Sequence, residues 1–77
     1  MNIERIERNA KIMGGKPVIK GTRLTVEYIL SMLAQDTSID DILQEYKGIE
    51  RADILACLSY AQNMIKETLL FDFPQAA

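Results

Sequence analysis

A basic segment punctuated by glycine and proline, residues 14–26, constrains the fold of this chain more than any other stretch. It reads GGKPVIKGTRLTV and is followed directly by a helical pattern. Gly21 tolerates the positive φ angles that other residues resist, and Pro17 cannot donate a hydrogen bond inside a central sheet. We therefore predict two short extended pieces, bent near Gly21, that form a basic β arm on a small helical domain.

After this arm, apolar residues recur at helical spacing in three stretches. Thr25 can cap the first helix, and Ser38, with Asp41 three residues on, can cap the second. Gly48 is a natural end signal for the second helix, and the third is predicted from about Arg51 to Lys66 or beyond. The predicted inward positions are Val26, Ile29, Leu30 and Leu33, then Ile39, Ile42, Leu43 and Tyr46, then Ile54, Leu58, Ala61, Ile65 and Leu69, with Leu55 beside the last group.

A short helix, a turn containing glycine and a longer helix have the spacing of a helix-turn-helix. The 77 residues are enough for one domain. We expect a mostly α fold, a three-helix helix-turn-helix domain of homeodomain-like or winged-helix-like type over residues 25–70. The basic β arm occupies residues 1–24 and an irregular tail residues 71–77. Because so short a chain buries only about 60–65% of its unfolded surface, we also expect a homodimer.

The composition excludes several kinds of functional site. The chain has no histidine, which is the commonest metal ligand and general base, and its single cysteine, Cys57, cannot form an internal disulfide. Gly15-Lys16 does not make a phosphate loop, because Ala10 stands where the first glycine is needed. We therefore expect no catalytic residues, no metal and no cofactor, and hence no enzyme. With neither a signal peptide nor an apolar run of membrane-spanning length, we expect a cytoplasmic protein that contacts no membrane.

The charge is unevenly distributed along the chain, whose net charge is −2. Residues 1–23 hold six basic and two acidic residues, whereas residues 24–77 hold three basic and nine acidic residues. This asymmetry favours contact with phosphate or with an acidic partner, and an ordinary solvated surface is the alternative. For double-stranded DNA, the start of the third helix is a poor match because it carries Glu50 and Asp53. The predicted DNA contacts are the basic side chains Lys16, Lys20, Arg23 and Arg51, with Arg5 and Arg8 as further candidates.

The basic segment also carries a family resemblance. Residues 14–23, GGKPVIKGTR, resemble the Gly-Gly-x-Pro-x-Ile-x-Gly-Thr-Arg signature of a prokaryotic family catalogued as domain of unknown function number 433. The resemblance extends from about Ile6 to Ala61, with Met13 where cysteine is common and Thr25 where proline is common. Members look like small antitoxins with a homeodomain-like helix-turn-helix. The resemblance implies binding to a small toxin ribonuclease of PIN-like fold, and to the promoter of the chain's own gene.

The segment after the third helix is apolar and aromatic, and residues 69–74 read LLFDFP. Such a segment can dock into a groove of a partner protein, or it can fold back to complete the core. We predict Phe71 and Phe73 as contacts to the toxin partner. Two other functions stay open at this point: a stand-alone DNA-binding transcriptional regulator, and a dimerisation or interaction module that has lost DNA binding.

Overall fold

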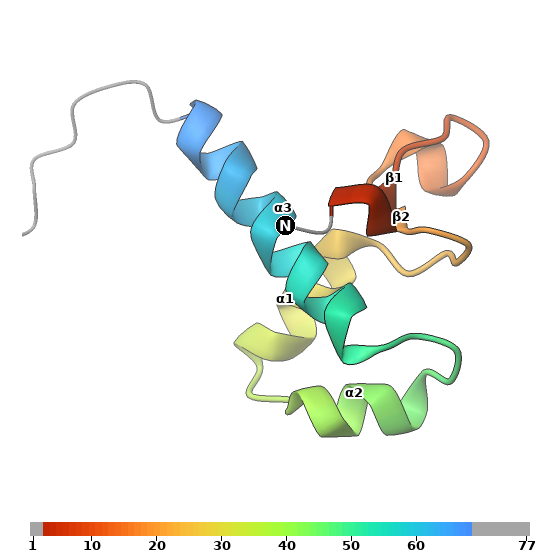
Figure 1. Ribbon diagram of the computed structural model, residues 1–77, viewed down its shortest axis with the longest axis vertical. Helices are drawn as coiled ribbons and strands as arrows, with labels where there is room; N and C mark the ends of the chain where they lie inside the picture. The colour runs from red at the N-terminus through yellow and green to blue at the C-terminus, as the bar shows by residue number, and fades with distance from the viewer. Residues whose placement is uncertain (1–2, 69–77) are drawn as a thin grey trace, which may run out of the picture.

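The fold is mostly α-helical, and the two shorter helices and the beginning of the chain pack against its longest helix (Figure 1). The computed structural model describes residues 3–68 of the chain. In chain order the elements are the 3₁₀ turn η1 (Ile3–Arg5), β1 (Ile6–Glu7), the 3₁₀ turn η2 (Met13–Gly15), β2 (Val18–Ile19), α1 (Val26–Ala34), α2 (Ile39–Glu45) and α3 (Arg51–Thr68). Three helices with a short N-terminal pair of β-strands confirm the predicted fold class.

The helices α1 and α2 begin where their predicted capping residues place them. The Thr25 hydroxyl accepts a hydrogen bond from the Tyr28 N–H at 3.0 Å, and the Ser38 hydroxyl accepts one from the Asp41 N–H at 3.0 Å. Gly48 adopts a φ of 96°, a conformation that other residues rarely take, and reverses the chain between α2 and α3. The predicted starts of α1 and α2 are therefore confirmed. The sequence predicts the end of α2 beside Gly48, but the helix ends earlier, at Glu45, because Tyr46 already leaves the helical conformation as the C-cap.

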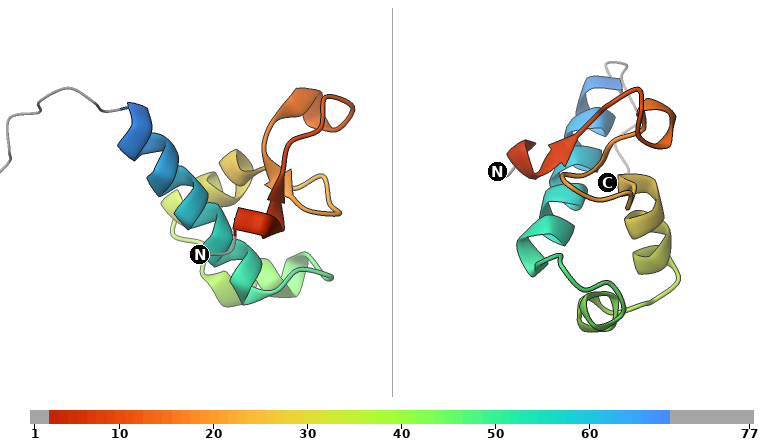
Figure 2. Two further views of the ribbon diagram at one scale, coloured as in Figure 1. Left: turned by 45° about the horizontal axis from the view of Figure 1, so that its top comes forward. Right: turned by 90° about the vertical axis from the view of Figure 1, so that its right-hand side faces the viewer.

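The basic arm folds back on itself and pairs within the chain. The chain turns at Gly21, whose φ is 81°, and brings Thr25 beside Val18. β1 then joins β2 in an antiparallel pair, with Ile6 opposite Ile19. Figure 2 shows η1 and β1 crossing one side of α3, while α1 lies on another side. Two extended pieces bent near Gly21 are thus confirmed, and the segment belongs to the core rather than projecting from it.

A single apolar core joins the N-terminal segment to the three helices. Its most buried side chains come from both parts of the chain: Val18, Ile19, Ile29, Ile42, Ile54 and Cys57. Burial raises the pKa of the Cys57 thiol to about 12, so the cysteine stays protonated and behaves as a small apolar residue.

The buried face of α3 differs from the predicted one. Leu58 is 42% exposed and Ile65 is 56% exposed, whereas Ala56 and Cys57 are buried. The cause is the N-terminal segment, because η1 and β1 cover a side of α3 that the periodicity leaves polar or small. Because α3 is contacted both by α1 and by the N-terminal segment, Ile54 and Cys57 are buried, and Leu55 and Leu58 remain exposed.

Near the start of α1, Tyr28 contacts the end of α2 through a pair of tyrosines. The hydroxyl groups of Tyr28 and Tyr46 lie 2.8 Å apart, and their rings meet edge to face with centroids 6.1 Å apart. This hydrogen bond is the main cause that raises the pKa of Tyr46 to about 12. The pair therefore fixes the end of α2 against the start of α1.

The corrected face of α3 predicts unequal effects for two similar substitutions. Ile54→Ala removes a fully buried side chain and should lower the free energy of unfolding by about 2–5 kcal/mol. Leu58→Ala, on the exposed face, should change it by less than about 1 kcal/mol. Urea unfolding followed by circular dichroism measures both. Equal losses of stability would contradict the assignment of the buried face.

Candidate functional site

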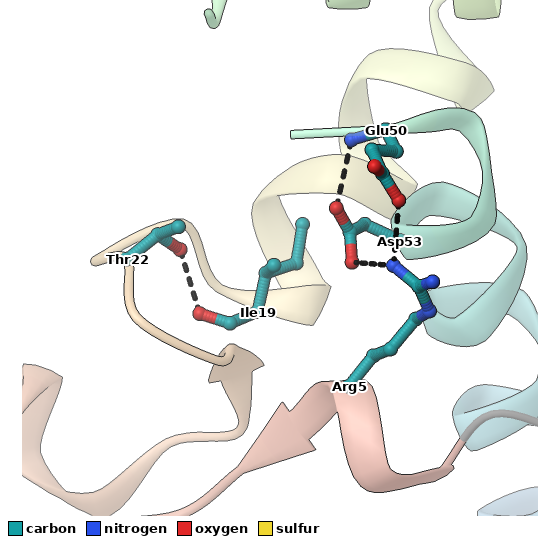
Figure 3. Close-up of polar contacts among 5 residues, drawn as sticks. All are labelled: Arg5, Ile19, Thr22, Glu50 and Asp53. Atoms are coloured by element: carbon teal, nitrogen blue, oxygen red, sulfur yellow. Dashed lines mark hydrogen bonds and ion pairs between the residues drawn. The ribbon is translucent and has the colours of Figure 1, made fainter. Parts of the chain in front are cut away.

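The first turn of α3 is held by a cluster of three charged side chains (Figure 3). Asp53 lies at its centre and is 8% exposed. One of its carboxylate oxygens accepts a hydrogen bond from the Glu50 N–H at 2.7 Å, which caps the helix in the manner of a capping box. The other oxygen accepts a hydrogen bond from the Arg5 Nη1 at 2.9 Å, and the same nitrogen lies 3.1 Å from Glu50 Oε1. We call Arg5, Glu50 and Asp53 the α3 clamp.

The α3 clamp changes the electrostatic character of the predicted DNA-reading helix. The bonds to Asp53 and then to Glu50 raise the pKa of Arg5 above its ordinary value, so its charge is permanent here. The positive charge of Arg5 offsets the negative charges of Glu50 and Asp53, which lie at the start of α3 and would repel the phosphates of DNA. Arg5, a further candidate for phosphate contact, is therefore engaged within the chain.

The turn that follows β2 presents two of the four predicted DNA contacts. Its shape depends on Thr22, whose hydroxyl donates to the Ile19 carbonyl at 2.8 Å and accepts from the Leu24 N–H at 3.0 Å. This leaves Lys20 and Arg23 on the outside of the turn, both exposed. In Figure 1 this turn projects to the same side as the loop between α2 and α3. We call residues 20–23 the basic turn.

The other two predicted DNA contacts, Lys16 and Arg51, lie outside the basic turn. Lys16 lies before β2 and forms an exposed ion pair with Glu27 of α1 at 3.4 Å. Arg51 is exposed at the first position of α3. Arg8 donates from Nε to the Gly15 carbonyl at 3.3 Å. The predicted toxin contacts, Phe71 and Phe73, lie outside the described residues.

A row of apolar side chains lies on the free face of α3. Leu55, Leu58 and Ile65 are 45%, 42% and 56% exposed. With Gln62 they follow spacings of three, four and three residues, which place them along one line of the helix. We call these four residues the α3 row. The predicted inward face of α3 includes Leu58 and Ile65, with Leu55 beside it, because periodicity identifies an apolar face without showing what covers it.

Among residues 3–68, no group of three or more histidine, cysteine, aspartate or glutamate side chains is placed to hold a metal ion. Within the same part of the chain, no helix is long and apolar enough to cross a membrane.

This arrangement is that of a small helix-turn-helix-like domain with an N-terminal β pair. The chain belongs to the DUF433 family, described as protein of unknown function, which matches residues 6–61. The fold is similar to the crystal structure of a DUF433 member protein from Anabaena variabilis, with a TM-score of 0.76 and 22% sequence identity. That similarity covers 82% of this chain and 62% of the other, so this chain spans less than two thirds of that protein. A comparison with curated proteins found no match.

The α3 clamp predicts that Asp53 contributes to stability more than its neighbour Glu50 does. Asp53→Ala should lower the free energy of unfolding by about 1–2 kcal/mol, because it removes the helix cap and leaves Arg5 without its buried partner. Glu50→Ala should cost less than about 0.5 kcal/mol, since its carboxylate is exposed. Chemical denaturation measures both, and the reverse order would refute the central role of Asp53.

Proposed function

We propose that this protein is the antitoxin-like half of a toxin–antitoxin pair. It binds and inhibits a small toxin ribonuclease of PIN-like fold, and it contacts the promoter of its own gene through the basic turn. The proposed contact with the toxin rests on one observation, the exposed apolar side chains of the α3 row. The family membership is compatible with this role, although the family's own description assigns no function.

The α3 row has the composition of a protein contact. Three large aliphatic side chains are exposed in one line, with Arg51 and Lys66 at its two ends. Apolar clusters rimmed by polar residues are typical of protein interfaces. By sequence the row leads toward the segment with Phe71 and Phe73, so the predicted aromatic contacts follow the same helix. The toxin is the occupant that we assign to this surface.

The expected homodimer is part of the proposal. A chain of 77 residues buries a smaller share of its surface on folding than a large domain does, so self-association would bury more apolar surface. Light scattering of the purified chain measures the oligomeric state directly. If Leu58→Asp turned a dimer into a monomer and left toxin binding unchanged, the row would be the dimer interface and the toxin site would lie elsewhere.

The antitoxin role predicts a specific partner and a specific loss of inhibition. Tagged protein should retain a ribonuclease from its native cell extract, and RNA cleavage by the separated partner should stop when the chain is added back. Leu58→Asp should weaken that inhibition by at least about tenfold, as expected for a central residue of an interface. Met13→Asp is the matched control, because Met13 has a similar exposed fraction on η2. Recovery of no ribonuclease, or of one that the chain does not inhibit, would overturn the proposal.

DNA binding is supported by a separate observation, the exposure of Lys20 and Arg23 on one turn. Duplex binding measured by fluorescence anisotropy should weaken as salt increases. Lys20→Ala with Arg23→Ala should reduce the log–log slope of affinity against salt by about 0.9 for each of the two side chains that neutralises a phosphate. Lys66→Ala, in the last turn of α3, is the control and should change little. If duplex binding cannot be measured at low salt, the protein acts as a partner-binding module alone.

A further inference from the structure

An apolar groove lies on the side of the molecule where α1 and α3 meet the residues before β2. Its volume is about 320 Å³. Val26 and Leu30 of α1 form one wall, and Tyr60, Ala61 and Met64 of α3 form the other. At the rim is the exposed ion pair between Lys16 and Glu27. None of these residues belongs to the α3 row, so the groove and the row are separate surfaces.

We propose that the chain's own C-terminal segment, residues 69–77, occupies this groove in the free protein. The length of the chain supports this occupant. The described part of α3 ends at Thr68, four residues after Met64, so the chain leaves the helix about 6 Å along the axis from the groove wall. Fully extended residues span about 3.3–3.6 Å each, so a segment that turned back from Thr68 would be long enough for Phe71 to reach Met64 and for Phe73 to reach Tyr60.

The composition of the segment complements the groove. Leu69, Leu70, Phe71 and Phe73 offer aliphatic and aromatic side chains to the apolar walls. Asp72 is the one charged residue of the segment, and its sign is opposite to that of Lys16 at the rim. The ammonium of Lys16 has three donors and can therefore bind Asp72 while keeping its contact with Glu27.

This inference concerns the free chain and does not depend on the toxin. It has a consequence for the proposed function, because Phe71 and Phe73 cannot fill the groove and contact a partner at the same time. A partner that binds these aromatic residues must first displace them from the groove. Binding of the segment to the groove would then lower the affinity of the segment for any partner.

The full chain contains no tryptophan, so Phe73→Trp provides a single probe of the segment. The indole should show blue-shifted emission and several-fold weaker quenching by acrylamide than free tryptophan does. Adding Ala61→Glu or Met64→Glu, which place a charge in the groove wall, should restore quenching. Leu58→Glu, on the α3 row outside the groove, is the matched control and should leave the probe protected. Circular dichroism shows that each variant is folded.

Charge exchange at the rim tests the pairing directly. Lys16→Glu should increase quenching of the probe, and Lys16→Glu combined with Asp72→Lys should reverse that increase. An indole as exposed as free tryptophan, or protected equally in the groove variants, would overturn the proposal. Protection that disappears on dilution would place the segment on a second copy of the chain, and protection seen only with the added toxin would assign the segment to the partner. Either of these results also overturns it.

Discussion

The hydrogen bond between Arg5 and Asp53 joins the beginning of the chain to the helix on which the rest of the fold packs. Asp53 serves two parts of the molecule at once, because one oxygen caps α3 and the other holds η1. An isolated surface ion pair contributes little to stability. This one is partly buried and shares its carboxylate with a helix end, so removing it disturbs both the helix start and the position of β1.

The position of β1 in turn decides which face of α3 is free. η1 and β1 cover one side of α3, and Ile54 and Cys57 are buried in the core. The aliphatic side chains of the α3 row are then left outside. The same packing positions β2, whose turn carries Lys20 and Arg23. The packing of η1 and β1 on α3 therefore determines both candidate contact surfaces, the α3 row and the basic turn.

Much of this fold could be predicted from the sequence, because its signals are local. Thr25 and Ser38 each act within four residues of their own position, and the starts of α1 and α2 follow from them. The bend at Gly21 is local in the same sense. The interaction of Arg5 with Asp53 spans 48 residues and leaves no pattern in the sequence. Without it, the periodicity of α3 predicts Leu58 as buried, and the candidate contact surface is assigned to the core.

The order of elements along the chain has a consequence for synthesis. The N-terminal segment, α1 and α2 all pack on α3, which is the last described helix to leave the ribosome. Most contacts that would hold the earlier elements are absent until Ile54 and Cys57 are available. Two-residue strands and helices of nine and seven residues are too short to persist alone in water. The nascent chain therefore remains open to proteases and chaperones until α3 emerges from the ribosome.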